Sequence, residues 1–206
     1  MTAIREPVLM PVALEDLRPT QITVGRREVE IKRKAWRDKS RKKEKEFLGR
    51  HLIPVVEGPK GRFYLIDHHH LALALHEEGV RDVQIVVFGD LSMVDEDLFW
   101  PTMSAHNWTH PFDDKGRRRD YKMIPKHLRD LIDDPYRSLA GELRRMGAFS
   151  KESEAFSEFQ WADFLRRRVK RTVIEKEFTR ALEMAMEFAK SKDAIYLPGW
   201  SGPDAE

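Results

Sequence analysis

Hydrophobic positions in the first half of the chain are grouped into short runs that predict two paired strands, a helix and a further strand. Leu52–Val56 is apolar and rich in β-branched residues, and Glu57–Gly61 supplies the glycine and proline of a turn. Phe63–Ile66 is a second apolar run, so the two runs predict a hairpin. Leu71–Glu78 follows as a helix-forming segment, and Val83–Phe88 is a continuous β-branched and aromatic run that is typical of a buried strand.

A polar turn separates the second of these strands from the helix. In the order strand, helix, strand, the runs predict a βαβ crossover whose first strand ends at Asp67–His70. Ligands of such sheets bind outside the carboxyl ends of the strands. The first amides of a helix have no partner within the helix, and the helix dipole favours an anion there. The pattern therefore predicts a phosphate site at this turn.

The segments on either side of this unit carry weaker patterns. Residues 8–17 alternate loosely around apolar positions, and Pro11 limits them to an edge strand. Arg27–Lys45 is expected to form one helix that is mostly solvated, because it has few apolar positions. Ser92–Trp100 predicts another helix, with Ser92 as its N-cap.

From Pro125 onward, hydrophobic residues recur at helical spacing. Asp134 and Pro135 are expected to start a helix as its N-cap and first residue, and Gly147 is expected to end it. Val173–Ala189 predicts a long helix with an apolar stripe. The residues expected to face inward in the helix after Asp134 are Tyr136, Leu139, Leu143 and Met146.

The change from strands to helices predicts an α+β (mixed α/β) fold. Residues 1–103 are expected to form an α/β domain, and residues 104–206 a mainly helical region packed on it. The absence of cysteine excludes disulfides, thiolate metal sites and cysteine nucleophiles. The chain shows no signal-peptide core and no apolar run of bilayer length, so a cytoplasmic location is expected.

The net charge is only +2, but the basic residues are clustered at Arg26–Arg50, Arg117–Arg119 and Arg166–Arg171. Such runs are either solvated faces whose cations pair with nearby carboxylates, or surfaces that contact nucleic acid. No helix-turn-helix signature accompanies them, which speaks against sequence-specific binding of DNA.

The turn Asp67–His70 concentrates titratable groups. The aspartate could orient a histidine or coordinate Mg²⁺, and a histidine could contact a phosphate or act as an acid or base. In the other interpretation, Asp67 caps the helix and one histidine packs in the core. Three consecutive histidines cannot all point inward, so at least one is expected to face a cleft or solvent.

The same turn resembles a known family. A strand with the pattern hydrophobic-Pro-hydrophobic, Ile53-Pro54-Val55-Val56, precedes a strand that ends in Asp67-His68-His69-His70-Leu71. This arrangement resembles the ParB/sulfiredoxin-like superfamily, whose members carry an Asp-Gly-His-His-Arg-like turn before a helix and bind nucleotide phosphates there. Leu17-Arg18-Pro19-Thr20-Gln21 is similar to the segment that opens ParB-type domains. The resemblance is greatest to the ParB-like nuclease group, and more distant to the free serine kinases of this fold.

The resemblance implies the residues of a site. Asp67 and His69 fall on the matching positions and would lie at the phosphates, with Mg²⁺ on Asp67. The neighbouring His68 and His70 would complete the phosphate site. In the serine kinases of this fold, a glutamate near the start of the first helix acts as general base, which makes Glu28 a candidate, with Glu30 as the alternative that spacing does not exclude. The other interpretation is that Glu28 pairs with neighbouring cations on a helix surface.

Two positions depart from the family pattern. His68 stands where the family often has glycine, and Leu71 stands where an arginine is common. The loss of that arginine removes a bidentate phosphate donor. His106, in a second polar loop, and Arg117, in a charged turn, are expected to contribute further phosphate contacts from the same cleft.

Three functions follow from these residues. The first is Mg²⁺-dependent nucleotide hydrolysis or phosphoryl transfer, with ATP, ADP or CTP as the nucleotide. The second is a ParB-like nuclease or DNA-binding protein that uses the basic clusters. The third is a non-catalytic scaffold that has kept the fold and lost the activity.

Overall fold

The computed structural model describes residues 9–39, 41–150 and 156–203, which form two compact units that interleave along the sequence. Unit 1 comprises Met1–Ile22, Val29–Pro111 and Arg118–Ile132, and unit 2 comprises Thr23–Glu28, Phe112–Arg117 and Asp133–Glu206. The sequence pattern predicted a single boundary after residue 103. In the two units, residues 104–111 and 118–132 lie with the sheet of unit 1, and residues 23–28 lie with the helices of unit 2.

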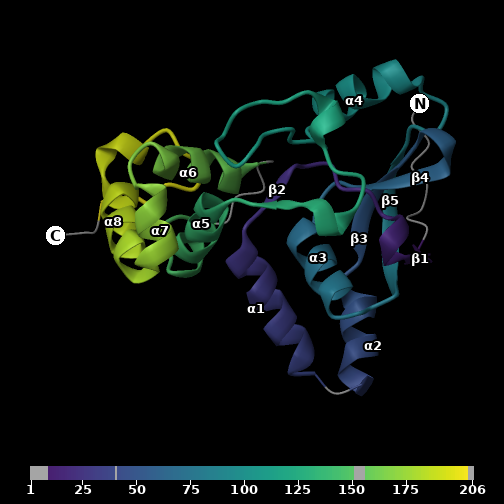
Figure 1. Ribbon diagram of the computed structural model, residues 1–206, viewed down its shortest axis with the longest axis horizontal. Coiled ribbons are helices and arrows are strands. Elements are labelled where there is room, and N and C mark those ends of the chain that lie inside the picture. The colour runs from purple at the N-terminus through teal and green to yellow at the C-terminus, as the bar shows by residue number, and fades with distance from the viewer. Residues whose placement is uncertain (1–8, 40, 151–155, 204–206) are drawn as a thin grey trace. The chain divides into compact units, whose positions relative to one another are not determined.

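Unit 1 is built on a four-stranded sheet of order β1-β5-β3-β4 (Figure 1). Its strands are β1 (Leu9–Ala13), β3 (Ile53–Gly58), β4 (Arg62–Leu65) and β5 (Asp82–Asp90). β1 lies at one edge of this sheet and pairs antiparallel with β5, which confirms the edge strand expected from Pro11. β3 and β4 form the predicted antiparallel hairpin.

The predicted βαβ crossover is wrong in its strand pairing. Helix α3 (His69–Glu77) does connect β4 to β5, but β5 pairs parallel with β3. Because β4 runs antiparallel to β3, it also runs opposite to β5. The turn Asp67–His70 therefore follows the carboxyl end of β4 but lies beside the amino ends of the parallel strands. The general rule on carboxyl ends of parallel strands does not explain a ligand site here.

Two helices replace the single helix expected over Arg27–Lys45. They are α1 (Arg26–Arg37) and α2 (Arg41–Arg50). The break between them brings Trp36 against Phe47, with the ring centroids 5.7 Å apart. An unbroken helix would hold these two residues about 16 Å apart along its axis. Contact between the two rings therefore requires the break.

Helix α4 (Glu96–Ala105) begins later than the sequence pattern predicted. Its N-cap is Asp95 and not Ser92. The amide and the hydroxyl of Ser92 both donate to Oδ1 of Asp90, at 3.0 and 2.6 Å. Ser92 is therefore part of the turn that follows β5.

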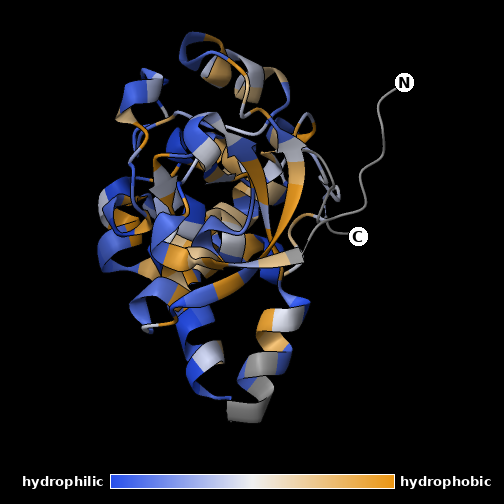
Figure 2. Cartoon of the chain, turned by 90° about the vertical axis from the view of Figure 1, so that its right-hand side faces the viewer, coloured by the Kyte–Doolittle hydropathy of each residue, from blue (hydrophilic) through white to orange (hydrophobic). Residues whose placement is uncertain are grey.

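The core of unit 1 lies between α3 and the sheet. Leu71–Leu75 is buried at every position, which explains why this run shows no polar face. The sheet contributes the buried residues Ile53, Val55, Leu65 and Ile85. The hydrophobic character of the strands is visible in Figure 2.

Unit 2 contains the helices α5 (Pro135–Arg145), α6 (Ser157–Arg166), α7 (Arg171–Lys176) and α8 (Phe178–Lys190) (Figure 1). The short strand β2 (Thr23–Val24) pairs with β6 (Ile132–Asp133). Trp161 and Phe164 of α6 are buried among residues of α5 that include Leu139 and Leu143. The indole nitrogen of Trp161 donates to the carbonyl of Pro198 at 2.8 Å.

In unit 2, the residues that mark the ends of a helix predict the structure correctly, whereas the prediction of one long helix does not. Asp134 is the N-cap of α5, and Gly147 follows its end with a φ of 80°, as predicted. Met146 was expected to face inward, but it is 54% exposed. The single helix expected over Val173–Ala189 is divided into α7 and α8 at Glu177, whose φ is −137°.

The helices and the mixed sheet together confirm the α+β fold. Within the residues that the structure describes, no helix combines the length and the apolar character needed to cross a membrane.

Candidate functional site

The turn Asp67–His70, which we call the histidine turn, is fixed by a histidine side chain to Leu52, the residue before strand β3. His68 is the N-cap of α3 and has a left-handed backbone (φ 65°). Its Nδ1 lies 3.1 Å from the carbonyl oxygen of Leu52, which can only accept, so Nδ1 donates. Oδ1 of Asp67 accepts the N–H of His68 at 2.6 Å. Asp67 is exposed, and it is not the helix cap that one interpretation of the sequence expected.

His69 is a buried anchor of the same turn. It is 5% exposed, and its Nε2 accepts the backbone N–H of Thr20 at 3.1 Å. An acceptor nitrogen carries no hydrogen, so the ring is the neutral tautomer with its hydrogen on Nδ1. His69 therefore holds the turn in place from inside unit 1.

Thr20 connects the histidine turn to two further segments. Its hydroxyl donates to the carbonyl of Leu65 at 2.5 Å. Its own carbonyl accepts the hydroxyl of Thr109 at 2.7 Å and the amide of His110 at 2.9 Å. Thr20 and Thr109 are both buried. The second polar loop of the sequence thus reaches the histidine turn through Thr109 and His110.

The start of α3 favours an anion. The side chain of His68 makes no capping hydrogen bond. The positive end of the helix dipole and the first amides of a helix together attract phosphate. The exposed carboxylate of Asp67, next to the N-cap, opposes this attraction unless a cation lies between carboxylate and phosphate.

The residues present fit a cation only in part. No group of three or more His, Asp or Glu side chains with metal-binding geometry occurs in the part of the chain that the structure describes. Mg²⁺ commonly takes one or two carboxylates together with phosphate oxygens and water. Asp67 therefore fits a Mg²⁺ that arrives with a phosphate ligand, and it does not form a metal site by itself.

The other predicted site residues of unit 1 lie in different surroundings. His70 is half-buried in the first turn of α3, beside His69. His106 is the exposed C-cap residue of α4, and its ring stacks on Trp108 with centroids 4.3 Å apart. The structure thus brings Asp67 and His68–His70 together, and it gives His106 a partner of its own. Its role as a phosphate contact stays a prediction.

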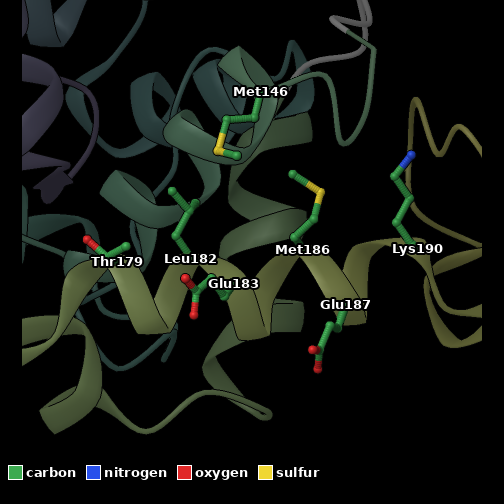
Figure 3. Close-up of a pocket in the computed structure, with 7 residues that line it drawn as sticks. All are labelled: Met146, Thr179, Leu182, Glu183, Met186, Glu187 and Lys190. Atoms are coloured by element: carbon green, nitrogen blue, oxygen red, sulfur yellow. The ribbon is translucent and has the colours of Figure 1, made fainter. Parts of the chain in front are cut away.

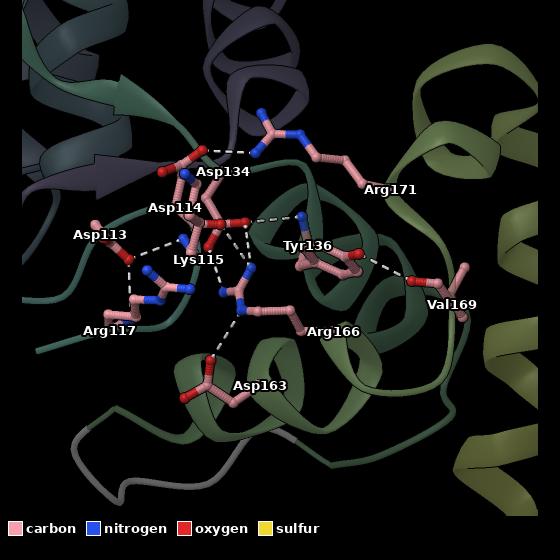
Figure 4. Close-up of polar contacts among 10 residues, drawn as sticks. All are labelled: Asp113, Asp114, Lys115, Arg117, Asp134, Tyr136, Asp163, Arg166, Val169 and Arg171. Atoms are coloured by element: carbon pink, nitrogen blue, oxygen red, sulfur yellow. Dashed lines mark hydrogen bonds and ion pairs between the residues drawn. The ribbon is translucent and has the colours of Figure 1, made fainter.

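Glu28 and Arg117 belong to unit 2. The side chain of Glu28 is 14% exposed, and its carboxylate is ion-paired with Arg145 of α5, which also pairs with Glu142. Arg117 is exposed, and its backbone N–H donates to Oδ1 of Asp113 at 2.9 Å (Figure 4). A catalytic role for Glu28 and a phosphate contact by Arg117 stay predictions.

A charge network in unit 2 is centred on the buried carboxylate of Asp134 (Figure 4). Arg166 donates to both of its oxygens, at 3.1 and 2.8 Å, and also to the carbonyl of Asp114 at 3.0 Å. Arg171 pairs with the carboxylate of Asp114 at 2.6 Å. Arg166 also contacts Asp163 at 3.2 Å; burial raises the pKa of Asp163, and Arg166 acts in the opposite direction.

This network engages much of the densest basic run, Arg166–Arg171. Arg166 and Arg171 pair with aspartates, as described. Arg168 lies over the ring of Phe164 and 3.7 Å from a carboxylate oxygen of Asp193. Three of the five cations of this run are therefore bound within unit 2, which supports the interpretation that the run pairs with nearby carboxylates.

A groove of about 700 Å³ lies along α8 in unit 2 (Figure 3). It is lined by Met146, Thr179, Leu182, Glu183, Met186, Glu187 and Lys190. None of the predicted site residues lines it. The groove is mostly apolar, and its single cation, Lys190, is outnumbered by the carboxylates of Glu183 and Glu187, so its charge disfavours a phosphate.

Comparison with known proteins places the fold and the turn in a family. Residues 10–167 match the family described as "Putative ParB-like nuclease", and the chain belongs to this ParB-like family. The crystal structure of protein Atu1540 from Agrobacterium tumefaciens is similar, with 50% sequence identity and a TM-score of 0.89. The similarity covers 96% of this chain and 100% of that chain. No curated protein matches the sequence significantly.

The family match confirms the resemblance and extends it. The motifs that carry the resemblance lie within the first ninety residues, whereas the match continues to residue 167 and includes all of α5 and α6. The histidine turn lies within the matched segment. Helices α7 and α8 lie beyond it.

Two threonines of the site were missed in the sequence. Thr20 lies inside the segment Leu17–Gln21, which was noted for its resemblance, and that segment could have pointed to it. Thr109 gave no signal, because a hydroxyl that binds a distant carbonyl looks like any polar loop residue in the sequence.

Proposed function

We propose that unit 1 binds the phosphates of a nucleotide at the histidine turn and, with Mg²⁺, hydrolyses the nucleotide or transfers its phosphoryl group. The start of α3 carries this proposal: its N-cap, His68, supplies no capping side chain, and the exposed carboxylate of Asp67 precedes it. An anion is favoured at such a helix start, and a carboxylate beside it suits the cation that accompanies phosphates.

The proposed roles follow from where each side chain lies. Asp67 would bind Mg²⁺ together with phosphate oxygens and water. Leu71 is buried where the family commonly has arginine, so Mg²⁺ would supply the positive charge that this position lacks. His68 and His70, half-buried at the start of α3, are the proposed phosphate contacts. His69 is a positioning residue, because its Nε2 is bound to Thr20.

Glu28 belongs to unit 2, and its role as a general base stays a prediction from the family resemblance. Because Arg145 is ion-paired with its carboxylate, base catalysis would have to begin with the opening of this pair. Arg145→Gln would then raise the rate of turnover. A rate that falls or stays constant in this variant would remove Glu28 from the proposal.

A thermal-shift screen with ATP, ADP, CTP and GTP, each with and without Mg²⁺, tests the proposal. A ligand that binds only the folded protein raises the melting temperature, by several degrees when its concentration is about 100 times the Kd. We expect such a rise for at least one nucleotide, and only in the presence of Mg²⁺. No rise with any nucleotide would contradict the proposal.

Asp67→Asn provides the sharper test. The side chain is exposed and the change is nearly isosteric, so the protein should fold normally. The Mg²⁺-dependent rise should be lost, and binding without Mg²⁺ should become stronger than in the wild type because a repulsive charge is gone. Asp97→Asn is the matched control, since Asp97 is an exposed aspartate in the first turn of α4. This control should change neither the Mg²⁺-dependent rise in melting temperature nor the binding without Mg²⁺.

Release of inorganic phosphate, measured on the same samples, separates binding from catalysis. Release of phosphate that Asp67→Asn abolishes would support an enzymatic function. If a nucleotide binds and none is hydrolysed, the proposal of a phosphate site stands, and the result supports a non-catalytic scaffold.

A further inference from the structure

The groove along α8, which we call the α8 groove, is one of two apolar sides of that helix. The first side is buried in the core of unit 2 and carries three alanines, Ala181, Ala185 and Ala189. Leu182 and Met186 belong to the second side and are only half-buried. Both point to the side of α8 on which Met146 lies, at the end of α5, and Met146 is 54% exposed (Figure 3). An apolar groove that is open to solvent is typical of a contact between proteins.

The charged residues of the α8 groove have a definite order along the helix. Glu183 is exposed, and no described cation forms an ion pair with it. Lys190 is the last residue of α8 and also lines the groove. The two positions are two helical turns apart, about 10.5 Å along the axis, with Met186 between them. The order acid, apolar, base becomes complementary to itself when a second copy of it is reversed.

We propose that the α8 groove binds the α8 groove of a second copy of this chain, with the two helices antiparallel about a two-fold axis beside Met186. Lys190 of each copy then lies opposite Glu183 of the other, and Met186 of each packs in the groove of the other. A basic helix from another protein would suit Glu183, but it would place a like charge beside Lys190. Helix α8 lies beyond the segment that matches the family, and the proposal does not depend on nucleotide binding at the histidine turn.

Glu187 limits the strength of this contact. It is exposed and follows Met186 directly, so one Glu187 carboxylate from each copy comes close to the axis. Like charges at this distance repel each other. Each copy contributes little more than one helix, and we therefore expect a weak dimer with a Kd in the micromolar range.

Sedimentation velocity of the full chain tests for this dimer, at protein concentrations from about 5 to about 200 µM. We expect a monomer at the lowest concentration and an increasing share of dimer as the concentration rises. A monomer throughout this range would overturn the proposal.

The two glutamates give opposite expectations in the same measurement. Glu183→Gln removes an attraction and should weaken the dimer about threefold, whereas Glu187→Gln removes a repulsion and should strengthen it by a similar factor. Both residues are exposed on the same helix, so a general effect of net charge would act in one direction for both variants. Glu183→Lys should weaken the dimer further, and the addition of Lys190→Glu should restore it. Effects in the same direction for the two glutamine variants would overturn the proposal.

Disulfide trapping tests the antiparallel orientation, because the chain has no cysteine of its own. Met186→Cys places one thiol of each copy beside the axis. Helix axes about 8–10 Å apart leave about 4–6 Å between Cα atoms that face each other, which is within the range of a disulfide. Thr179→Cys is the matched control, because Thr179 is exposed in the same groove but the two copies of this position lie about 22 Å apart along the antiparallel pair.

We expect Met186→Cys to form a covalent dimer under mild oxidation, much faster than Thr179→Cys does. The melting temperature of each reduced variant shows that it is folded. A folded Met186→Cys variant that stays monomeric, or that cross-links no faster than Thr179→Cys, would overturn the proposal.

Discussion

Each unit contains a helix that begins beside an aspartate, and the two aspartates are placed one residue apart relative to the helix. Asp134 is the N-cap of α5; its Oδ1 accepts the N–H of Tyr136 at 3.0 Å, and Arg166 donates to both carboxylate oxygens. Asp67 precedes the N-cap of α3, and its Oδ1 accepts the N–H of His68, outside the helix. One carboxylate is 1% exposed and stabilises its helix, while the other is exposed and accessible to a ligand.

The basic segments Arg166–Arg171 of unit 2 and Arg118–Asp130 of unit 1 differ in the same way, because the first has paired cations and the second has exposed ones. In unit 2, Arg166 and Arg171 are bound by aspartates of the same unit. In unit 1, Lys122 and Arg129 are exposed, and no described carboxylate pairs with them. Density of charge in the sequence is therefore a poor guide to charge that a ligand can use. The charges of unit 2 mainly stabilise its fold, and those of unit 1 are the better candidates for binding.

The largest effect is expected for Arg166→Met. It would leave the carboxylate of Asp134 buried without its cation, which costs about 3–5 kcal/mol in the free energy of unfolding. Urea unfolding measures this loss. Arg167→Met, at the exposed neighbouring position, should change the same free energy by no more than about 0.5 kcal/mol. Equal effects of the two variants would show that the charge network does not stabilise unit 2.

A smaller effect is expected for His69→Ala in unit 1. It leaves the buried N–H of Thr20 without its acceptor and opens a cavity, which together cost about 2–4 kcal/mol. His69→Gln carries an amide oxygen that can take the place of Nε2, so it should recover at least half of the loss. Equal destabilisation by His69→Gln and His69→Ala would show that His69 does not stabilise unit 1 through its hydrogen bond to Thr20.

The smallest effect concerns the pH dependence of Asp163. Burial raises its pKa above the ordinary value of 3.8, so the folded protein keeps the proton to a higher pH than the unfolded chain does. This favours the folded state below pH 3.8, and the contribution is lost as the pH rises through the raised pKa. The difference in unfolding free energy between Asp163→Asn and the wild type should therefore move in favour of the variant as the pH rises. Urea unfolding at several pH values measures it, and movement in the opposite direction would contradict the raised pKa.

Much of the fold could be predicted because its signals are local. The hairpin of β3 and β4 follows from two apolar runs and a turn, and the start of α5 follows from Asp134 and Pro135. The pairing of β5 with β3 could not be predicted, because an apolar run in the sequence does not indicate which other strand it pairs with. The break between α1 and α2 allows a contact between Trp36 and Phe47 that is distant in sequence and forms only in the folded chain.

The candidate site could be located from the sequence, but its geometry could not. The histidine turn was identified from its residue types and from the family resemblance. That His69 faces inward depends on Thr20, 49 residues earlier in the chain. The pairing of Arg166 likewise depends on Asp134, 32 residues away. Spacing along the chain carries no information about such partners, so sequence alone could not separate bound charges from accessible ones.

The central claim, that the start of α3 is open to phosphate while the start of α5 is closed, is tested most directly by nuclear magnetic resonance. An ¹H–¹⁵N spectrum of the protein is recorded during titration with Mg²⁺ and the nucleotide that gives the largest thermal shift, or with Mg²⁺ and ATP if none does. We predict that the amide signals of His70 and Leu71 move, that the signal of Tyr136 stays in place, and that the movement no longer depends on Mg²⁺ in Asp67→Asn. Constant signals at His70 and Leu71, or equal movement at Tyr136, would contradict this account.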